Sequence, residues 1–425
     1  MKHILPKMAV ALLLSIILVT GLVACGSGDD AAPPPAPPAQ NSRETQSDTP
    51  QGVSSQYSEQ PAIMPTEIQE STTDPIDITW IATAAAGGMT VHSSHSLAVQ
   101  DGGYLWAWGH NDSGQLGDGT TVNRYSPVRI TDNIAAVSNG GSHTVAIKTD
   151  SSLWAWGANS HGQLGDGTTT DRHSPIRIMD NIVAVSAGGG RTFAIGTNNN
   201  LWAWGNNGFG AIGDGTTTWR HRPVRIMEDV SVVSAGHWHA TAIRNDGSLW
   251  TWGENSVGQL GDGTTVNRHN PVMVLDEVLT VSAGTFHTMA IRTDGSLWAW
   301  GSNEFGQLGD GTTTNRRYPI KIMDDVAIVS AGLSHTMAIR NDGSLWAWGV
   351  NYQGMLGDGT TIDRHSPIRI MDNITDVSAG AAYTIVLRYD GSLWAWGSNW
   401  NGRLGDGTAT NRQNPVRVMD NTRLP

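Results

Sequence analysis

Cysteine is almost absent from this chain of 425 residues. Cys25 is the single one, so no disulfide can form within the chain. Phenylalanine is rare too, at four residues, so a core has to be built from other side chains. Lys and Arg number 26 against 38 Asp and Glu, and the resulting net charge of -12 argues against the basic stripe of a nucleic-acid-binding surface. The acidic residues are spread out, which predicts a solvated exterior and no particular cationic partner.

The chain also lacks the sequence signs of a catalytic site. It has no nucleophile elbow and no phosphate-binding loop. It has no cluster of acid, base and nucleophile that occurs only once. We therefore expect a protein without catalytic activity and without a cofactor.

Tryptophan, in contrast, is abundant at 18 residues, and most of it is arranged in a repeat. The string Leu-Trp-Ala-Trp-Gly recurs every 48 residues, with LWTWG as the fourth copy. The seven copies begin at Leu105, Leu153, Leu201, Leu249, Leu297, Leu345 and Leu393. The paired tryptophans are Trp106, Trp108, Trp154, Trp156, Trp202, Trp204, Trp250, Trp252, Trp298, Trp300, Trp346, Trp348, Trp394 and Trp396. Repeats of this length bury their apolar faces against one another, so we assign these fourteen residues to the core.

Each repeat predicts four short strands separated by turns. In the fifth copy we expect strands over residues 279–283, 288–292, 296–300 and 319–323. Asp294-Gly295 is a two-residue hairpin signal, and Pro319 is placed at the start of its strand, where a missing N–H is tolerated. Because side chains alternate along a strand, Trp298 and Trp300 are expected on one side of the sheet.

Seven units of four strands predict an all-β fold, a seven-bladed β-propeller of four-stranded blades. An open solenoid is the alternative, but it would need polar capping repeats, and the end copies look ordinary. The first copy is longer between Ala85 and His95 and carries an extra His92. We expect the last strand, residues 415–419, to close the ring near residues 76–86.

The N-terminus has the pattern of a secretion signal. Residues 1–7 carry Lys2 and Lys7, and a strongly apolar stretch over 8–23 follows. The end of this stretch, Leu22-Val23-Ala24-Cys25, resembles the lipobox of bacterial lipoproteins. The resemblance implies a signal peptide over 1–24 and a lipid on Cys25, which becomes the mature N-terminus. An uncleaved transmembrane helix is the alternative, since the stretch is near the lower length limit for one.

Residues 25–75 have no hydrophobic period and contain a run of proline and alanine followed by Ser, Thr, Gln and Glu. Such a segment cannot bury enough apolar area to fold. We therefore expect three parts: the signal peptide at 1–24, the lipidated cysteine with a disordered tether at 25–75, and the propeller of 48-residue repeats at 76–425. The propeller would be exported and lipid-anchored to the bacterial cell membrane, facing outside the cytoplasm.

The repeated pattern Gly-x-x-His-Thr followed by Asp-Gly-Ser-Leu-Trp-Ala-Trp-Gly-x-Asn-x-x-Gly-Gln-Leu-Gly resembles the regulator of chromosome condensation (alpha-tubulin suppressor-like) repeat. The resemblance covers residues 78–425 and implies a seven-bladed propeller that binds proteins. Known members include a nuclear nucleotide-exchange factor, a plant ultraviolet photoreceptor and secreted bacterial inhibitors of β-lactamase, so the fold alone does not choose the function. This chain departs from the pattern at Arg191, at Asn198-Asn199-Asn200, at Ala211-Ile212, at Met355, at Tyr383 and at Arg403.

Two repeated polar sets suggest metal sites at first sight. His95, His143, His239, His287 and His335 share one repeat position, and each Gly-Asp-Gly-Thr loop holds one aspartate, such as Asp310. Metal sites need several converging ligands, which neither set offers. We expect the histidines to cap turns or bind the adjacent blade, and the aspartates to form Asx turns and bind the repeated arginines. No metal is predicted.

The residues that do not repeat point to a binding surface. The loop before each hairpin and the loop after it are expected at the same end of a blade, and the opposite Asp-Gly end is expected to stay small and polar. Non-repeating residues in these loops are Trp238, Phe286, Phe209, Phe305, Tyr352 and Trp400, with His161, Glu304 and Tyr383. Scattered aromatic residues on a rigid scaffold are typical of protein-recognition surfaces. The alternative is that they are incidental loop residues. The light chemistry of the photoreceptor is not supported, because Trp238 alone lies in a Gly-x-x-His loop.

These observations favour a surface-anchored, non-catalytic propeller that binds an unidentified protein, in an adhesion, scaffold or inhibitor-like role. We expect a monomer that contacts the membrane through its lipid anchor only and binds no nucleic acid. One alternative is a surface enzyme that acts on glycan or a cell-wall polymer. A second is guanine-nucleotide exchange by analogy with the family, which export from the cytoplasm disfavours.

Overall fold

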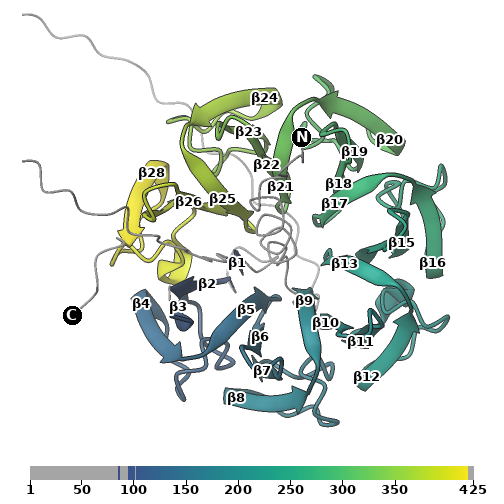
Figure 1. Cartoon of the computed structure of the whole chain (residues 1–425). Coiled ribbons are helices and arrows are strands. Elements are labelled where there is room, and N and C mark those ends of the chain that lie inside the picture. The colour runs from purple at the N-terminus through teal and green to yellow at the C-terminus, as the bar shows by residue number, and fades with distance from the viewer. Residues whose placement is uncertain (1–84, 87–93, 101, 420–425) are drawn as a thin grey trace, which may run out of the picture. The chain divides into compact units, whose positions relative to one another are not determined.

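The computed structural model describes residues 85–86, 94–100 and 102–419, and this part of the chain folds into seven antiparallel four-stranded sheets. The sheets are arranged as blades around a central axis, which confirms the predicted seven-bladed β-propeller (Figure 1). Each blade is one continuous stretch of chain, and its strands follow one another in sequence order from the axis outward.

The two inner strands of each blade are short. The innermost ones are β1 (Ala85–Ala86), β5 (Ile134–Asn139), β9 (Ile182–Gly188), β13 (Val230–Ala235), β17 (Val278–Ala283), β21 (Val326–Ala331) and β25 (Ile374–Ala379). The second ones are β2 (His95–Gln100), β6 (His143–Lys148), β10 (Arg191–Gly196), β14 (His239–Arg244), β18 (His287–Arg292), β22 (His335–Arg340) and β26 (Tyr383–Arg388).

The third strands carry the paired tryptophans, and the fourth strands form the outer edge. The third ones are β3 (Tyr104–Gly109), β7 (Leu153–Gly157), β11 (Leu201–Gly205), β15 (Leu249–Gly253), β19 (Leu297–Gly301), β23 (Leu345–Gly349) and β27 (Leu393–Gly397). The fourth ones are β4 (Arg124–Thr131), β8 (Arg172–Met179), β12 (Arg220–Met227), β16 (Arg268–Leu275), β20 (Arg316–Met323), β24 (Arg364–Met371) and β28 (Arg412–Met419). Two short 3₁₀ turns complete the fold, η1 (Gly208–Gly210) and η2 (Trp400–Gly402).

The hairpin between the second and third strands differs from the two-residue turn that Asp294-Gly295 predicts. The N–H of Arg292 donates to the carbonyl of Ser296 (2.9 Å), so the loop contains three residues. Gly295 has a φ of 78°, which fits a type I turn followed by a left-handed residue. The side chain of Asp294 accepts the N–H of Ser296 (2.9 Å) and holds the turn.

The fourth strand begins earlier than predicted. β20 starts at Arg316, so Pro319 lies inside it and not at its start. The register against β19 shifts between Ala299 and Gly301. Within the described residues the far side of β20 pairs with no other strand, so an outer-edge position tolerates the missing N–H of proline.

The second tryptophan of each pair joins neighbouring blades. Trp300 is fully buried and packs against Ile243 and Leu249 of the preceding blade. Its indole Nε1 donates to the carbonyl oxygen of Gln259 (2.9 Å) in that blade. The same bond joins Trp156 to Gln115, Trp204 to Gln163, Trp252 to Ala211, Trp348 to Gln307, Trp396 to Met355 and Trp108 to Arg403. The seven indoles therefore fill and hydrogen-bond all seven interfaces between blades.

The first tryptophan of each pair is only half-buried and lies nearer the Asp-Gly end. Trp298 Nε1 donates to Ser296 Oγ (2.9 Å), and the Arg292 guanidinium lies 5.8 Å from the indole centroid. The repeated tryptophans thus divide into seven core residues and seven that cover the edge of the core. The prediction that this end stays small and polar is wrong at two positions, because Tyr104 and Tyr389 are exposed there.

The ring closes by packing and not by an exchanged strand. Ala85 and Ala86 pair with β2 in the first blade, and β28 pairs with β27 in the seventh, so the predicted closure by residues 415–419 is wrong. The seam has the indole bond of the other interfaces, from Trp108 Nε1 to the carbonyl of Arg403 (2.9 Å). Because each sequence unit supplies all the strands of one blade, no strand remains to be exchanged.

The N-terminal predictions lie outside the described residues. They are the signal peptide at 1–24, the lipidated Cys25, the tether at 25–75 and the extra His92. Among the residues that the structure describes, no helix has the length and apolar character to cross a membrane.

Candidate binding face

Two loops of each blade emerge at one end of the propeller, and together they form what we name the loop face. In the fifth blade these are the loop between β17 and β18 and the loop between β19 and β20. His287 pairs with Gly301, and the N–H of Ser302 donates to the carbonyl of Phe286 (2.8 Å), so both loops start from the same edge of the sheet. The prediction that they share one end is confirmed.

The six predicted binding residues all belong to these loops, in the third to seventh blades. Phe209 and Phe305 are each 44% exposed, Tyr352 is 51% exposed and Trp400 is 54% exposed. Trp238 and Phe286 are half-buried. Phe209 and Trp238 meet in a ring contact between the third and fourth blades. Phe286 and Phe305 belong to the fifth blade, Tyr352 to the sixth and Trp400 to the seventh.

The Phe209–Trp238 contact forms a fixed aromatic cluster at the junction of the third and fourth blades. The ring centroids are 5.5 Å apart in an edge-to-face arrangement, and His237 packs on the other part of Trp238 at 4.2 Å. Arg191 is fully buried below, donates from Nη2 to the carbonyl of His237 (2.6 Å), and lies 5.9 Å from the Trp238 ring. A rigid, partly exposed indole of this kind is a typical anchor residue of an interface.

The loop that carries Phe209 lacks a glutamine bond that other blades have. In the equivalent loop of the fifth blade, the N–H of Phe305 donates to the side chain of Gln307 (3.0 Å). The third blade has Ala211 at the glutamine position, and there the chain forms η1 with Phe209 at a φ of 60°. A left-handed non-glycine residue costs on the order of 1 kcal/mol, and such strain is often found at functional sites.

Glu254 is a candidate that sequence reasoning missed. Its backbone N–H donates to the carbonyl of Trp238 (3.0 Å), which places it beside the aromatic cluster. The side chain is 7% exposed, and Oε1 accepts the N–H of Ser256 (2.9 Å). Oε2 is buried and has no hydrogen-bond donor among the described residues. The signal was present in the sequence, because the other six repeats have no acidic residue at this position.

The repeated histidines hold blades together. In each case Nε2 contacts a threonine hydroxyl of the next blade, as between His287 and Thr336 (3.0 Å). Thr336 donates its own hydrogen to the carbonyl of Gln307, so His287 is the donor in this bond. Burial lowers the pKa of His95, His143, His239, His287 and His335 to about 3. These imidazoles are therefore neutral and enclosed, as the predicted contact with the adjacent blade requires.

The two exceptions to the histidine pattern serve the same purpose. Arg191 binds the His237 carbonyl of the fourth blade. Tyr383 donates its hydroxyl to the carbonyl of His95 (2.9 Å) across the seam between the seventh and first blades. Arg191 and Tyr383 are both buried and therefore act in packing. Tyr383, which the sequence suggested for the binding face, is thus not part of an exposed surface.

The repeated aspartates form the Asx turns that were predicted. Asp310 Oδ1 accepts the N–H of Thr312 (3.0 Å), and its Oδ2 accepts Arg316 Nε (2.9 Å) in the same loop. Partial burial alone would raise the pKa of Asp310, but the hydrogen bonds from Arg316 and Thr312 outweigh it and lower that pKa. Nowhere in the described part of the chain do three or more His, Cys, Asp or Glu side chains gather as metal ligands.

Comparison with known proteins agrees with this architecture. A model of the RCC1-like domain matches residues 131–424, and a model of the regulator of chromosome condensation (RCC1) repeat matches residues 102–147. The fold is that of a propeller built from such repeats. The chain belongs to the RCC1-like domain family.

Solved structures share the fold at low sequence identity. Human WBSCR16 is 22% identical over 75% of this chain and 94% of its own, with a TM-score of 0.68. Prp20p from Saccharomyces cerevisiae, described with its binding properties to Gsp1p and histones, is 21% identical over 76% of this chain and 87% of its own, with a TM-score of 0.69. Yeast RCC1 (Prp20) bound to Kap60 is 20% identical over 84% of this chain and 91% of its own, with a TM-score of 0.69.

Proposed function

We propose that this protein is an exported, lipid-anchored propeller that binds a protein partner through its loop face and performs no catalysis. One observation carries the proposal. The repeated side chains hold the blades together, whereas six non-repeating aromatic residues lie in the loops at one end and remain partly exposed. Aromatic residues exposed on a rigid scaffold are the usual centre of a protein interface.

The chemistry of the loop face also suggests what the partner offers. Trp238 and Phe209 provide an apolar anchor site, and the backbone N–H of Glu254 donates to the carbonyl of Trp238. The buried Oε2 of Glu254 has no donor among the described residues, which is unfavourable, so a partner that rearranges this loop and supplies an N–H or ammonium group would be favoured. We propose that the partner inserts an apolar side chain with a lysine, arginine or backbone N–H next to it.

The relatives support a protein-binding role in general terms. Prp20p was described with its binding to Gsp1p and histones, and yeast RCC1 (Prp20) as a complex with Kap60. At about one-fifth identity, this likeness supports the use of a propeller face for binding and does not carry those partners over to this chain.

Removing the anchors is expected to abolish binding without unfolding the propeller. Trp238→Ala with Trp400→Ala should weaken partner binding by about 1,000-fold, because two anchor residues at about 2 kcal/mol each remove about 4 kcal/mol of binding free energy. The measurement is a cross-linking pull-down with the tagged full-length protein from the cells that produce it, quantified by mass spectrometry. Phe209→Asn adds a sharp test, since asparagine tolerates the left-handed backbone that Asn401 adopts at the same position.

The matched control for the loop face is Tyr389→Ala. Tyr389 is 84% exposed at the opposite Asp-Gly end, so its loss removes an aromatic side chain of similar size from the other side. Capture that survives in the loop-face variant, or that fails in the Tyr389 variant, contradicts the proposed face. Turnover of a polysaccharide or peptidoglycan library by the purified protein would contradict the non-catalytic part of the proposal.

The membrane anchor has a test of its own. Cys25→Ser removes the thiol that would carry the lipid, so the protein should lose incorporation of radiolabelled palmitate and leave the membrane fraction. The measurement is fractionation followed by immunoblotting. A variant that stays in the membrane fraction as fully as the wild type would instead support the uncleaved transmembrane helix.

A further inference from the structure

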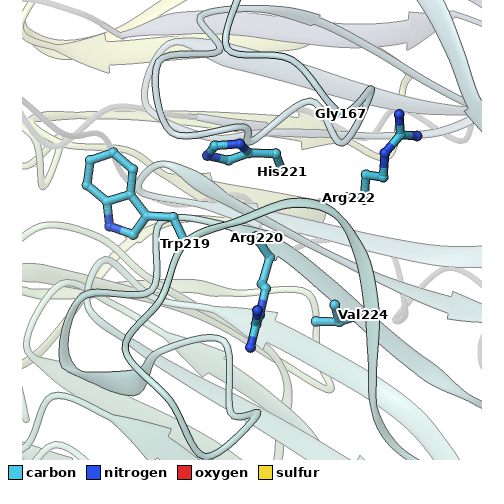
Figure 2. A pocket seen from close by; sticks show the side chains of 6 residues that line it. All are labelled: Gly167, Trp219, Arg220, His221, Arg222 and Val224. Atoms are coloured by element: carbon cyan, nitrogen blue, oxygen red, sulfur yellow. The ribbon is translucent and has the colours of Figure 1, made fainter.

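A shallow hollow of about 280 Å³ lies at the outer edge of the propeller, between the second and third blades. It is lined by Gly167, Trp219, Arg220, His221, Arg222 and Val224. Figure 2 shows Trp219 and Arg222 on either side of His221, with Arg220 directed away from them. Gly167 belongs to the loop between β7 and β8, and the other residues lie at the start of β12 or just before it.

The indole in this hollow is a departure from the repeat. Six blades have Asn or Asp at the position of Trp219, and that side chain accepts a backbone N–H of the same loop, as Asn315 does from Asn303 (2.6 Å). Trp219 cannot accept this bond. Its ring packs on His161 of the second blade, with 4.5 Å between centroids, and the side chain remains 46% exposed. The third blade therefore replaces a hydrogen bond within its loop by an exposed aromatic surface.

Arg222 is a second residue of the hollow that departs from the repeat. Arg222 stands where the other blades have Ser, Asn or Tyr, and a Cβ added at Gly167 would overlap its guanidinium. Arg220 is neutralised by Asp214, with Nε 2.6 Å from Oδ2. Among the arginines and lysines of the described part of the chain, the side chains of Arg222 and Arg317 alone have no hydrogen bond, ion pair or ring contact.

The geometry points to a binding site for a carboxylate-bearing sugar, such as a uronic acid unit of an acidic polysaccharide, at this hollow. A guanidinium without a partner presents paired N–H donors that match a carboxylate. The flat, exposed face of Trp219 offers a surface for the apolar C–H face of a sugar ring, and His221 lies between the two and provides a further polar contact (Figure 2). Trp219 would thus bind the sugar ring while Arg222 binds its carboxylate.

The shape of the hollow favours a sugar over an acidic peptide. It is open and shallow, and Val224 is the one aliphatic side chain in its lining. A peptide needs a pocket for an apolar side chain or a strand edge with its N–H donors in place. The outer edge of β12 pairs with no strand among the described residues, but β12 contains Pro223, which has no N–H. An internal unit of a polysaccharide can instead lie across an open surface. Gly167 and Trp219 belong to the β7–β8 and β11–β12 loops, but the lining contains none of the six predicted binding residues, so the two proposals can be tested separately.

The test uses an oligogalacturonate titrated into the full-length protein by isothermal calorimetry at low salt. We expect binding that weakens as salt is added, because the contact is partly ionic and exposed. Arg222→Ser restores the residue of the first, second and sixth blades and should weaken binding about tenfold or more. Trp219→Asn restores the residue of the first, fourth, fifth and seventh blades and should have a similar effect.

Arg317→His is the matched control, since the Arg317 side chain also has no partner among the described residues and Arg317 does not line this hollow. This variant should bind like the wild type. The methyl-esterified oligogalacturonate, which lacks the charge, should bind far more weakly. The assignment is overturned if the oligogalacturonate does not bind, if Arg317→His weakens binding as much as Arg222→Ser, or if a polyglutamate peptide binds equally well.

Discussion

Acidification from pH 7 to pH 4.5 is expected to lower the unfolding temperature steeply, before most carboxylates titrate. Burial holds the pKa of five histidines at about 3 in the folded protein, against 6.5 for an unperturbed histidine. Below pH 6.5 the unfolded chain therefore binds protons that the folded protein cannot bind. The five neutral histidines contribute their full stabilisation above pH 6.5. As the pH decreases below this value, the free energy of unfolding falls by about 1.4 kcal/mol per pH unit for each histidine.

Asp376 and the loop aspartates modify the pH dependence of stability. Burial raises the pKa of Asp376 to about 8, so its protonation stabilises the folded state as the pH falls, but this side chain is only half-buried and counts for less than one enclosed histidine. The loop aspartates act in the same direction as the histidines. Hydrogen bonds from Arg172 and Thr168 lower the pKa of Asp166 to about 2 against the opposing effect of burial, so its contribution is lost as the pH falls below 3.8.

The measurement is the unfolding temperature at intervals from pH 7.5 to pH 4.5, with His287→Gln as the comparison. Glutamine can still donate to Thr336 but does not titrate, so the variant should lose part of the pH dependence, about one fifth of it. An unfolding temperature that stays constant between pH 7 and pH 5 would show that the histidines are not enclosed in neutral form.

The repeat made the architecture and the shared contacts predictable. Seven equally spaced copies predict units that stack on one another. The period of two along residues 297–300 predicts that Trp298 and Trp300 lie on one side of the sheet. The repeated aspartates and arginines could be paired because both recur at a constant separation, and the structure joins them within one loop, as in Asp310 and Arg316. Constancy along the sequence was therefore sufficient to predict what all blades share.

The features that were missed depend on distances between blades. Trp298 and Trp300 look equivalent in sequence, yet Trp300 is fully buried and hydrogen-bonds to the preceding blade, whereas Trp298 is half-buried and bonds to Ser296. Glu254 is enclosed with its Oε2 unpaired among the described residues, and no spacing along the chain predicts this enclosure. The exposed Trp219 was passed over because the predicted face was limited to two loop segments, although its departure from Asn and Asp was visible in the sequence.

The largest effect of a single substitution is expected at a buried tryptophan of the blade interfaces. Trp300→Ala removes a fully buried indole, leaves a cavity against Ile243 and Leu249, and leaves the carbonyl of Gln259 without its indole donor. The free energy of unfolding should fall by about 3–5 kcal/mol. Trp298→Ala, two residues away on the same strand, should have a clearly smaller effect, because that indole is half-buried and its Nε1 bond reaches only Ser296.

Urea unfolding followed by circular dichroism compares the two variants directly. Repeat proteins unfold in parts when one interface is weakened, so Trp300→Ala should also broaden the transition or split it in two. Trp298→Ala should keep a single transition with a slightly lower midpoint. Equal losses for the two substitutions would mean that position along the strand, and not contact with the preceding blade, determines what each tryptophan contributes, and the division of the fourteen residues into two sets would have to be abandoned.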